Sequence, residues 1–239
     1  MSKTVYPGVY QHRRIEEIKP DVFFLQGSVQ IKPGLNISRN MTILRQNGEL
    51  TLINAVRLDT VGLKELESLG KITYVVKIGH FHGMDDRYYL DTYGAKFCCL
   101  DGVDPQTTPK QNVLLKDGDI ISGAKVLVFN NANEKECVLL LPEHEGILIT
   151  CDSIQYFHDT TYMSWFAKIM LPLLGFKKGM LLGPPWLKTM TPKGSSLQSD
   201  FERILQEDFK IHISAHWGYC DDDVQGKIRM AIDNAFPKK

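Results

Sequence analysis

Short apolar runs of strand length alternate with helical segments along most of this 239-residue chain, and that alternation limits the fold class more than any other feature. The strand-like runs cover residues 41–46, 50–56, 71–78, 95–100, 124–130, 137–141, 146–151 and 210–217. The helical segments cover residues 59–70, 85–94, 163–176, 199–209 and 221–236. Strands interleaved with helices predict a layered α/β domain whose sheets are covered by helices, because each apolar face must pack on another layer.

Local signals mark where several of these elements begin or turn. Asn47-Gly48 separates the first two apolar runs and predicts a hairpin, since both residues tolerate positive φ. Asp59 precedes a helical pattern and is placed to act as its N-cap. Ser199 and Glu202 have the spacing of a capping box, which predicts that a helix starts at Ser199.

The composition excludes two classes of protein. At 43% hydrophobic residues the chain can build a core, so it is not intrinsically disordered. Twenty-eight basic residues cancel 28 acidic ones, and there is no run rich in lysine and arginine. A balanced charge of this kind argues against a nucleic-acid-binding protein.

Cysteine usage and the first residues of the chain bear on the compartment. The five cysteines are Cys98, Cys99, Cys137, Cys151 and Cys220. Their number is odd and no CxxC spacing occurs, so we interpret them as reduced thiols. The first residues lack the apolar core of a signal peptide. Together these features predict a cytoplasmic protein.

The longest apolar stretch, residues 163–176, is too short to span a bilayer and contains Lys168 and Pro172. We expect a buried or half-buried helix here, in preference to a helix that docks on a membrane surface or a partner. The same stretch would also fit a homodimer interface. The Gly- and Pro-rich residues 183–196 that follow are expected to form an ordered surface loop.

Three of the strand-like runs end in side chains that bind metals. The run 71–78 leads into His80 and His82, the run 146–151 leads into Asp152, and the run 210–217 contains His216. Side chains at strand ends often form sites in α/β folds, because the sheet is rigid and the loops are free to shape the site. Imidazole and carboxylate ligands suit zinc, manganese or ferrous iron.

The order of these segments resembles that of the metallo-β-lactamase-fold superfamily over about residues 20–236. The hairpin, the helix before ITYVVKIGHFHGMDD, then ILITCDS and ISAHWG follow each other as they do in that family. The resemblance implies one domain, residues 1–239, folded as an αββα sandwich with helices outside two mixed sheets. It also implies a hydrolase with one or two metal ions along the sheet edge.

The first motif of that family, T-H-x-H-x-D-H, is only partly present. His80 and His82 match its first two histidines. Met84 stands where the family has aspartate, and Asp85 stands where it has a third histidine. A one-residue slip would instead place Asp85 in the aspartate role.

Two later ligands of the family match, and one is missing. Asp152 in ITCDS matches the bridging aspartate, and His216 in SAHWG matches the last histidine. The middle histidine has no counterpart, because the equivalent residues 129–137 contain asparagine and glutamate but no histidine. The resemblance therefore implies a degenerate active site with a reduced set of ligands.

The resemblance implies a metal-dependent hydrolase of a small ester, lactone or thioester. The incomplete ligand set implies a mononuclear site for zinc or another divalent metal such as iron or manganese, where a bound water can become hydroxide near neutral pH. The candidate metal ligands are His80, His82, Asp85, Asp152 and His216, and Asp85 is also the candidate general base. Two alternatives remain: a non-catalytic binding protein of this fold that has lost its metal, and an iron protein with a redox function.

Four further residues are candidates for substrate binding. Trp165 and Trp186 are candidates for an apolar wall over the metal, and their alternative role is ordinary core packing. Lys188 and Lys193, with glycine and serine amides beside them, are candidates for attracting an anionic substrate. The alternative for these lysines is a solvated surface loop.

Overall fold

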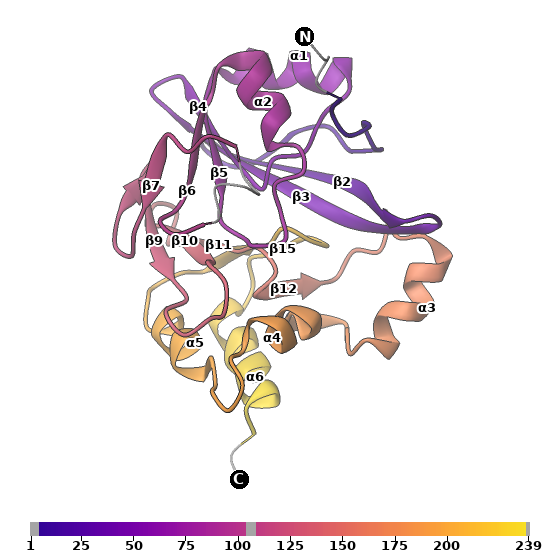
Figure 1. The fold of residues 1–239 in the computed structure, drawn as a ribbon, viewed down its shortest axis with the longest axis vertical. Coiled ribbons are helices and arrows are strands. Elements are labelled where there is room, and N and C mark those ends of the chain that lie inside the picture. The colour runs from indigo at the N-terminus through magenta and orange to yellow at the C-terminus, as the bar shows by residue number, and fades with distance from the viewer. Residues whose placement is uncertain (1–4, 104–108, 238–239) are drawn as a thin grey trace.

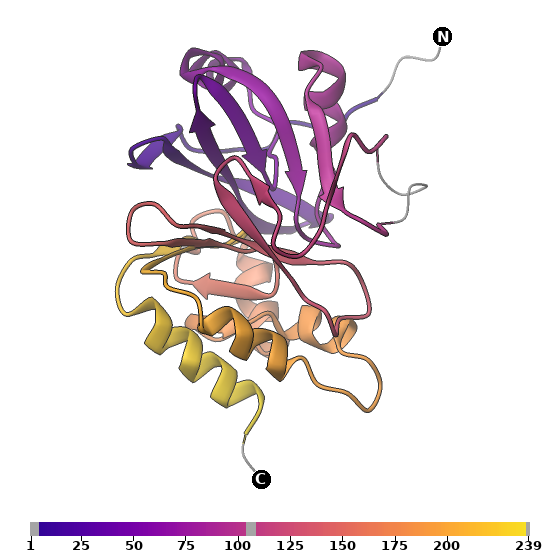
Figure 2. The same cartoon turned by 90° about the vertical axis from the view of Figure 1, so that its left-hand side faces the viewer.

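Two mixed β-sheets pack face to face, with helices on the outer face of each, so the molecule has four layers (Figures 1 and 2). The computed structural model describes residues 5–103 and 109–237. Each sheet contains both parallel and antiparallel strand pairs. The predicted αββα sandwich with mixed sheets is therefore confirmed.

The first sheet is formed by the N-terminal half of the chain, with its strands in chain order. They are β1 (Glu16–Lys19), β2 (Val22–Lys32), β3 (Leu35–Gln46), β4 (Glu49–Ile53), β5 (Lys71–Lys77), β6 (Lys96–Leu100) and β7 (Val113–Leu115). Strands β1 to β4 pair antiparallel, and β4 to β7 pair parallel. Asn47 and Gly48 have φ values of 52° and 79° between β3 and β4, which confirms the predicted hairpin turn.

Helices α1 (Thr60–Leu69) and α2 (Asp86–Tyr93) cover the outer face of this sheet (Figure 1). The side chain of Asp59 accepts a hydrogen bond from the backbone N–H of Gly62 at 2.7 Å, as expected of an N-cap. A core of apolar side chains that includes Leu52, Leu66 and Phe97 lies between the helices and the sheet. The helix predicted to start after Asp59 is therefore confirmed, and it belongs to the outer helical layer of the first sheet.

The second sheet is formed by the C-terminal half of the chain. Its strands, in spatial order, are β15 (Tyr219–Cys220), β14 (Ile211–Ile213), β11 (Ile147–Ile149), β10 (Cys137–Leu141), β9 (Ala124–Val128) and β8 (Ile120–Ile121). A separate pair, β12 (Ile154–Phe157) and β13 (Gly179–Leu182), lies next to it. Helices α4 (Pro184–Met190), α5 (Gln198–Leu205) and α6 (Val224–Ala235) cover its outer face.

The space between the two sheets is filled by apolar side chains from both. Ile53 and Val76 of the first sheet belong to the same buried cluster as Leu139 and Ile149 of the second. All five cysteines are buried and free. This shared core sets the two sheets against each other, so that strand ends from both can meet at one edge.

Two sequence predictions about the helices of the second half were wrong. Helix α5 begins at Gln198 without a side-chain cap, so Ser199 lies inside the first turn and no capping box forms. Instead the buried carboxylate of Asp200 accepts hydrogen bonds from the backbone N–H groups of Asn130 and Asn131. The expected loop 183–196 contains helix α4, whose first turn is favoured by two prolines that preset φ.

Helix α3 (Trp165–Leu173) lies at the margin of the molecule, beside the tip of the β2–β3 hairpin (Figure 1). Its first turn is capped by Ser164, whose hydroxyl accepts from the backbone N–H of Ala167 at 3.3 Å. Among its nine residues only Ala167 and Leu171 are buried. The expectation of a buried or half-buried helix is therefore wrong for most of its side chains, because the helix touches the rest of the protein along one narrow face.

Candidate metal centre

His82, Asp152 and His216 meet at one point between the two sheets, and each offers one ligand atom within 4.8 Å of the others. The Nε2 atom of His82 lies 3.4 Å from Oδ2 of Asp152, and Nε2 of His216 lies 3.0 Å from Oδ1 of the same carboxylate. The two Nε2 atoms are 3.1 Å apart. Two imidazoles and a carboxylate thus direct their free atoms toward a common position.

Strand pairing explains why residues so distant in the sequence meet here. Strands β11 and β14 are parallel neighbours, with Ile149 paired to Ile213. Asp152 and His216 each follow those paired residues by three positions, so they leave the sheet side by side. His82 follows β5 of the other sheet and approaches the pair from across the sandwich.

The orientation of His216 is set by the backbone of β3. Its Nδ1 atom donates to the carbonyl oxygen of Ser38 at a distance of 2.6 Å. A carbonyl can only accept, so the proton sits on Nδ1 and the lone pair of Nε2 is left for a ligand. A histidine held through its second nitrogen in this way is typical of metal sites.

Asp152 is held by a chain of hydrogen bonds behind the site. Nε2 of Gln155 donates to the backbone carbonyl of Asp152 at 3.0 Å and lies 3.4 Å from Oδ1. Oε1 of Gln155 accepts from the indole N–H of Trp217 at 2.8 Å. With Asp152 held in this way, its Oδ2 atom is directed toward His82.

Electrostatics favour one ionised carboxylate beside two imidazoles. Burial lowers the pKa of His82, and the attraction of Asp152 does not offset it. Burial also lowers the pKa of His216, but the hydrogen bond and charge of Asp152 outweigh that effect and raise the pKa above its ordinary value. Burial raises the pKa of Asp152, yet the two histidines hold it far below its usual range. A divalent cation would displace any proton bound at these ligand atoms.

The donor set fits a metal of the kind that the sequence suggested. Two imidazole nitrogens and one carboxylate oxygen suit zinc, iron or manganese, and three protein ligands leave open positions for water and substrate. Zinc sites with catalytic function have this number of protein ligands. His82, Asp152 and His216 would hold the ion.

His80 lies outside this cluster. Its side chain is exposed and Nδ1 lies 3.7 Å from a carboxylate oxygen of Glu134. The chain turns sharply after β5, where the Lys77 ammonium donates to the carbonyl oxygens of His80 and His82. Histidines two apart share one side of an extended strand, but here the strand has ended, so the two side chains diverge.

Asp85 also lies outside the cluster, in a fully buried position before α2. Its carboxylate forms an ion pair with Arg39 and accepts a hydrogen bond from the backbone N–H of Arg57 at 2.9 Å. Arg39 is the next residue after Ser38 on β3. The sequence did not single out Ser38 or Arg39, since neither is a ligand type and neither has a motif around it.

Glu136 is a buried carboxyl near the centre that no sequence motif marks as a site residue. Burial raises its pKa to about 8, and the charge of Asp152 adds to that effect. Its Oε2 accepts from the backbone N–H of His80 at 3.2 Å. The signal was an acidic residue directly before a fully apolar strand, in the segment 129–137 that lacks the middle histidine.

A cleft of about 970 Å³ opens onto the three ligands. Its lining is mostly apolar: the β2–β3 hairpin contributes Val29, Ile31 and Leu35, and α3 with its C-cap contributes Phe166, Met170 and Leu174. Polar side chains besides the three ligands, among them Lys32, Arg39 and Gln155, complete the lining. The site therefore combines a polar end, at the ligands, with an apolar chamber.

Of the four predicted substrate-binding residues, Trp186 alone lines the cleft. It is also packed against Phe129 and Phe201 in the core of the second half. Trp165 is exposed on α3, outside the residues that line the cleft. Lys188 and Lys193 are exposed and also lie outside that lining.

Comparison with protein-family models and with curated protein sequences finds no match. Solved structures do match. The metallo-β-lactamase FIM-1 from Pseudomonas aeruginosa, in its mono-zinc form, aligns over 97% of this chain and 99% of its own with a TM-score of 0.65 and 12% identity. A metallo-β-lactamase from Hirschia baltica aligns over 93% of this chain and 98% of its own, with a TM-score of 0.61 and 15% identity.

A flavo di-iron protein from Thermotoga maritima aligns over 96% of this chain but only 64% of its own, with a TM-score of 0.65 and 16% identity. These structures share almost the whole course of the backbone with this chain at very low sequence identity. The likeness extends through both sheets and their helices, in agreement with the motif order found in the sequence. This chain has the metallo-β-lactamase fold.

Proposed function

We propose that this protein is a metal-dependent hydrolase with a mononuclear site held by His82, Asp152 and His216. The observation that carries the proposal is the convergence of their three ligand atoms at the polar end of an apolar cleft. Exposed His80 and ion-paired Asp85 leave this set at three protein ligands, which supports one metal ion more than two. Zinc is the metal we expect, since the ligands are two histidines and a carboxylate.

A divalent metal bound with an open position lowers the pKa of a coordinated water and polarises a substrate carbonyl. The protein's own groups prepare the site for this chemistry. Ser38 holds the ring of His216 through Nδ1, and Gln155 holds Asp152, so the ligand atoms are positioned in advance. Asp85 would act as a positioning residue, because its carboxylate anchors Arg39 at the cleft wall.

The substrate we propose is an ester, lactone or thioester with an apolar acyl part. The cleft offers aliphatic and aromatic walls to such a chain, while the reacting carbonyl would lie at its polar end. Burial of the acyl chain would also exclude bulk water from the site. The buried free thiols are consistent with a reducing compartment, so we place the enzyme in the cytoplasm.

The proposal is tested by metal analysis of protein purified without chelators, together with two matched variants. His82→Ala removes a ligand, and His80→Ala removes an exposed histidine two residues away. We expect about one equivalent of metal in the native protein and in His80→Ala, and less than about a tenth of an equivalent in His82→Ala. Hydrolysis of p-nitrophenyl butyrate, a γ-lactone and an acyl thioester should be lost together with the metal.

The opposite result would support the non-catalytic alternative. If the native protein holds less than about a tenth of an equivalent of metal, and His82→Ala changes neither binding nor turnover, the hydrolase proposal fails. Iron in the same assay, without hydrolysis of any of the three substrates, would favour a redox protein instead.

A further inference from the structure

Helix α3 carries apolar side chains on almost every face. Trp165, Ile169 and Leu173, spaced four residues apart, form an outward stripe and are 74%, 55% and 76% exposed. A helix that turns such a stripe toward water exposes an apolar surface without a partner inside the protein.

The adjoining stripe of the same helix lines the cleft. Phe166, Met170 and Leu174 face the chamber, and Ile31 at the tip of the β2–β3 hairpin lines it from the other side. Ile31 is itself exposed. The backbone of Asn36 ties the hairpin to α3, since its carbonyl accepts from the N–H of Ser164 at 3.1 Å. The apolar surface therefore runs from the outside of α3 across the mouth of the cleft to the hairpin tip.

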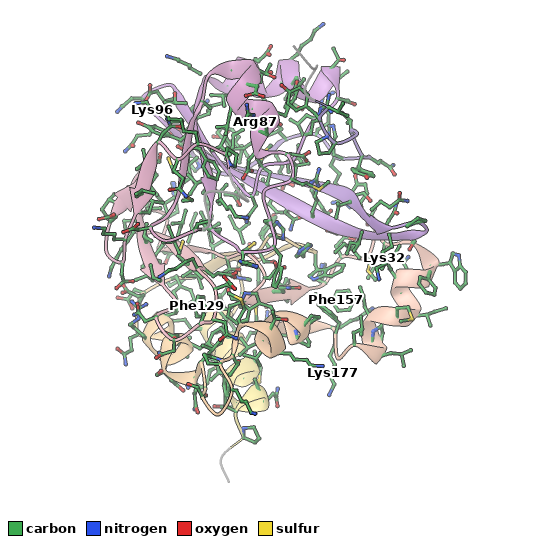
Figure 3. All side chains as sticks on the ribbon, in the orientation of Figure 1. Lys32, Arg87, Lys96, Phe129, Phe157 and Lys177 are labelled. Carbon is green, nitrogen blue, oxygen red and sulfur yellow. The ribbon has the colours of Figure 1, made fainter. Side chains whose placement is uncertain are left out.

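Positive charge surrounds this surface. Residues 160–199 contain five lysines and no acidic residue, although the chain as a whole is neutral. Lys168, Lys177 and Lys178 are exposed, as is Lys32 on the hairpin. Figure 3 shows Lys32 beside the upper end of α3 and Lys177 beyond its lower end. None of the four forms an ion pair with an acidic side chain in the described residues. An apolar surface bordered by lysines is complementary to an anionic lipid surface.

A second copy of the chain fits this surface less well. A two-fold interface would place the same patch on both partners, and the lysines of one copy would then face those of the other. No helix in residues 5–103 and 109–237 is long and apolar enough to cross a membrane. With nine residues α3 is about 14 Å long, less than half of a bilayer's apolar core, so it would lie in the plane of the interface.

We propose that α3 and the tip of the β2–β3 hairpin dock on the surface of an anionic phospholipid membrane, with Trp165, Ile169 and Leu173 inserted among the lipids. The lysines would reach the phosphate groups while their aliphatic stems cover the boundary. Docking would also turn the mouth of the cleft toward the membrane. A lipid acyl chain would then enter the cleft from the membrane as the substrate of the hydrolase, a consequence that rests on the proposed function. The docking itself does not depend on that function.

The chain contains its own probe for this interaction. Trp165 is exposed, whereas Trp186 and Trp217 are buried in the protein. Vesicles of phosphatidylglycerol and phosphatidylcholine should therefore shift the tryptophan emission to the blue, and brominated lipids should quench it. Trp165→Phe should abolish the shift but keep co-sedimentation with the vesicles. Vesicles of pure phosphatidylcholine should bind several-fold more weakly, because the lysines then lose their partners.

Variants separate docking from unspecific adhesion. Ile169→Asp combined with Leu173→Asp should weaken co-sedimentation roughly tenfold or more, since two charges would enter the interface. Met230→Asp on α6, a residue that is 58% exposed on another face, should bind as the native protein does. Lys177→Glu combined with Lys178→Glu should reduce binding to anionic vesicles only.

The absence of co-sedimentation with anionic vesicles would overturn the docking proposal. A dimer, seen by light scattering, that the Ile169→Asp and Leu173→Asp pair dissociates would in that case identify a second copy of the chain as the occupant of this surface. Neither measurement requires turnover or bound metal, so docking can fail while the hydrolase proposal stands, and the reverse.

Discussion

Arg39 and Asp85 form a buried ion pair, and Arg39 lies on β3 directly after Ser38, whose carbonyl orients His216. The pair joins β3 to the start of α2. A carboxylate that the motif order suggested as a ligand or base is thus engaged with an internal cation. The ion pair with Arg39 explains why Asp85 is buried near the His80–His82 segment without belonging to the ligand cluster.

Arg39→Met should destabilise the protein by about 3–5 kcal/mol, because it leaves the carboxylate of Asp85 buried without its cation. Asp85→Asn in the same chain should restore part of that loss. Urea unfolding of the single and double variants gives the coupling energy. Arg87→Met serves as the matched control, since its pair with Asp91 is exposed and should contribute far less to stability. Equal losses in Arg39→Met and Arg87→Met would show that the buried pair does not stabilise the fold.

Gln155→Leu should weaken metal binding by about 10- to 100-fold, because it removes the amide that holds Asp152 in place. The variant also leaves the indole N–H of Trp217 without its acceptor, so some loss of stability is expected. Competition with a metal chelator measures the affinity. Gln225→Leu, which changes an exposed glutamine on α6, is the control. An unchanged metal affinity in Gln155→Leu would mean that the hydrogen bond from Gln155 is not needed to position Asp152.

Stability should fall in mild acid because of His212. Burial lowers its pKa to about 3, and its Nε2–H donates to the hydroxyl of Thr150 at 2.9 Å. In the unfolded chain the pKa is near 6.5, so between these two values only the unfolded state takes up the proton. The contribution of His212 to stability is therefore complete above about pH 6.5 and is lost as the pH falls toward 3.

Between pH 7 and pH 5 this one group should cost about 2 kcal/mol. His212→Gln keeps a donor for Thr150 and removes the titration, so its unfolding free energy should depend less on pH over that interval. Urea unfolding at both pH values provides the comparison, and His158→Gln at an exposed position is the control. Parallel pH profiles for the native protein and His212→Gln would contradict the assignment.

Gly79→Ala should destabilise the protein by about 1–3 kcal/mol, because Gly79, two residues after the end of β5, packs closely against Cys151, the residue before Asp152. A Cβ atom at Gly79 would come within 2.1 Å of the sulfur of Cys151 and 2.6 Å of its Cβ. Cys151→Gly should therefore recover part of the stability in the double variant. Gly218→Ala near the metal centre meets no atom within 4 Å and should be nearly neutral. Thermal unfolding distinguishes the two glycines.

Elements defined by short-range interactions were predictable from the residues alone. Asn47-Gly48 makes its turn through its own backbone preferences, and Asp59 caps the helix that starts at the next residue by accepting from the N–H of Gly62. Strands β1 and β2 were not foreseen, although β2 is eleven residues long. The spacing of Ser199 and Glu202 suggested a cap, but Asp200 is drawn to the loop at Asn131 and the helix begins earlier.

The same division holds at the site. The sequence by itself determined the order of the ligand-bearing strands, and from that order came the fold and the roles proposed for Asp152 and His216. Only the tertiary structure decided between His80 and His82, because the Lys77 ammonium binds the carbonyls of this loop and turns it at the end of β5. The exposure of helix α3 to solvent also became clear only from the tertiary structure. Apolar periodicity shows which residues share a face, whereas the solvent or core that the face meets depends on how distant segments pack.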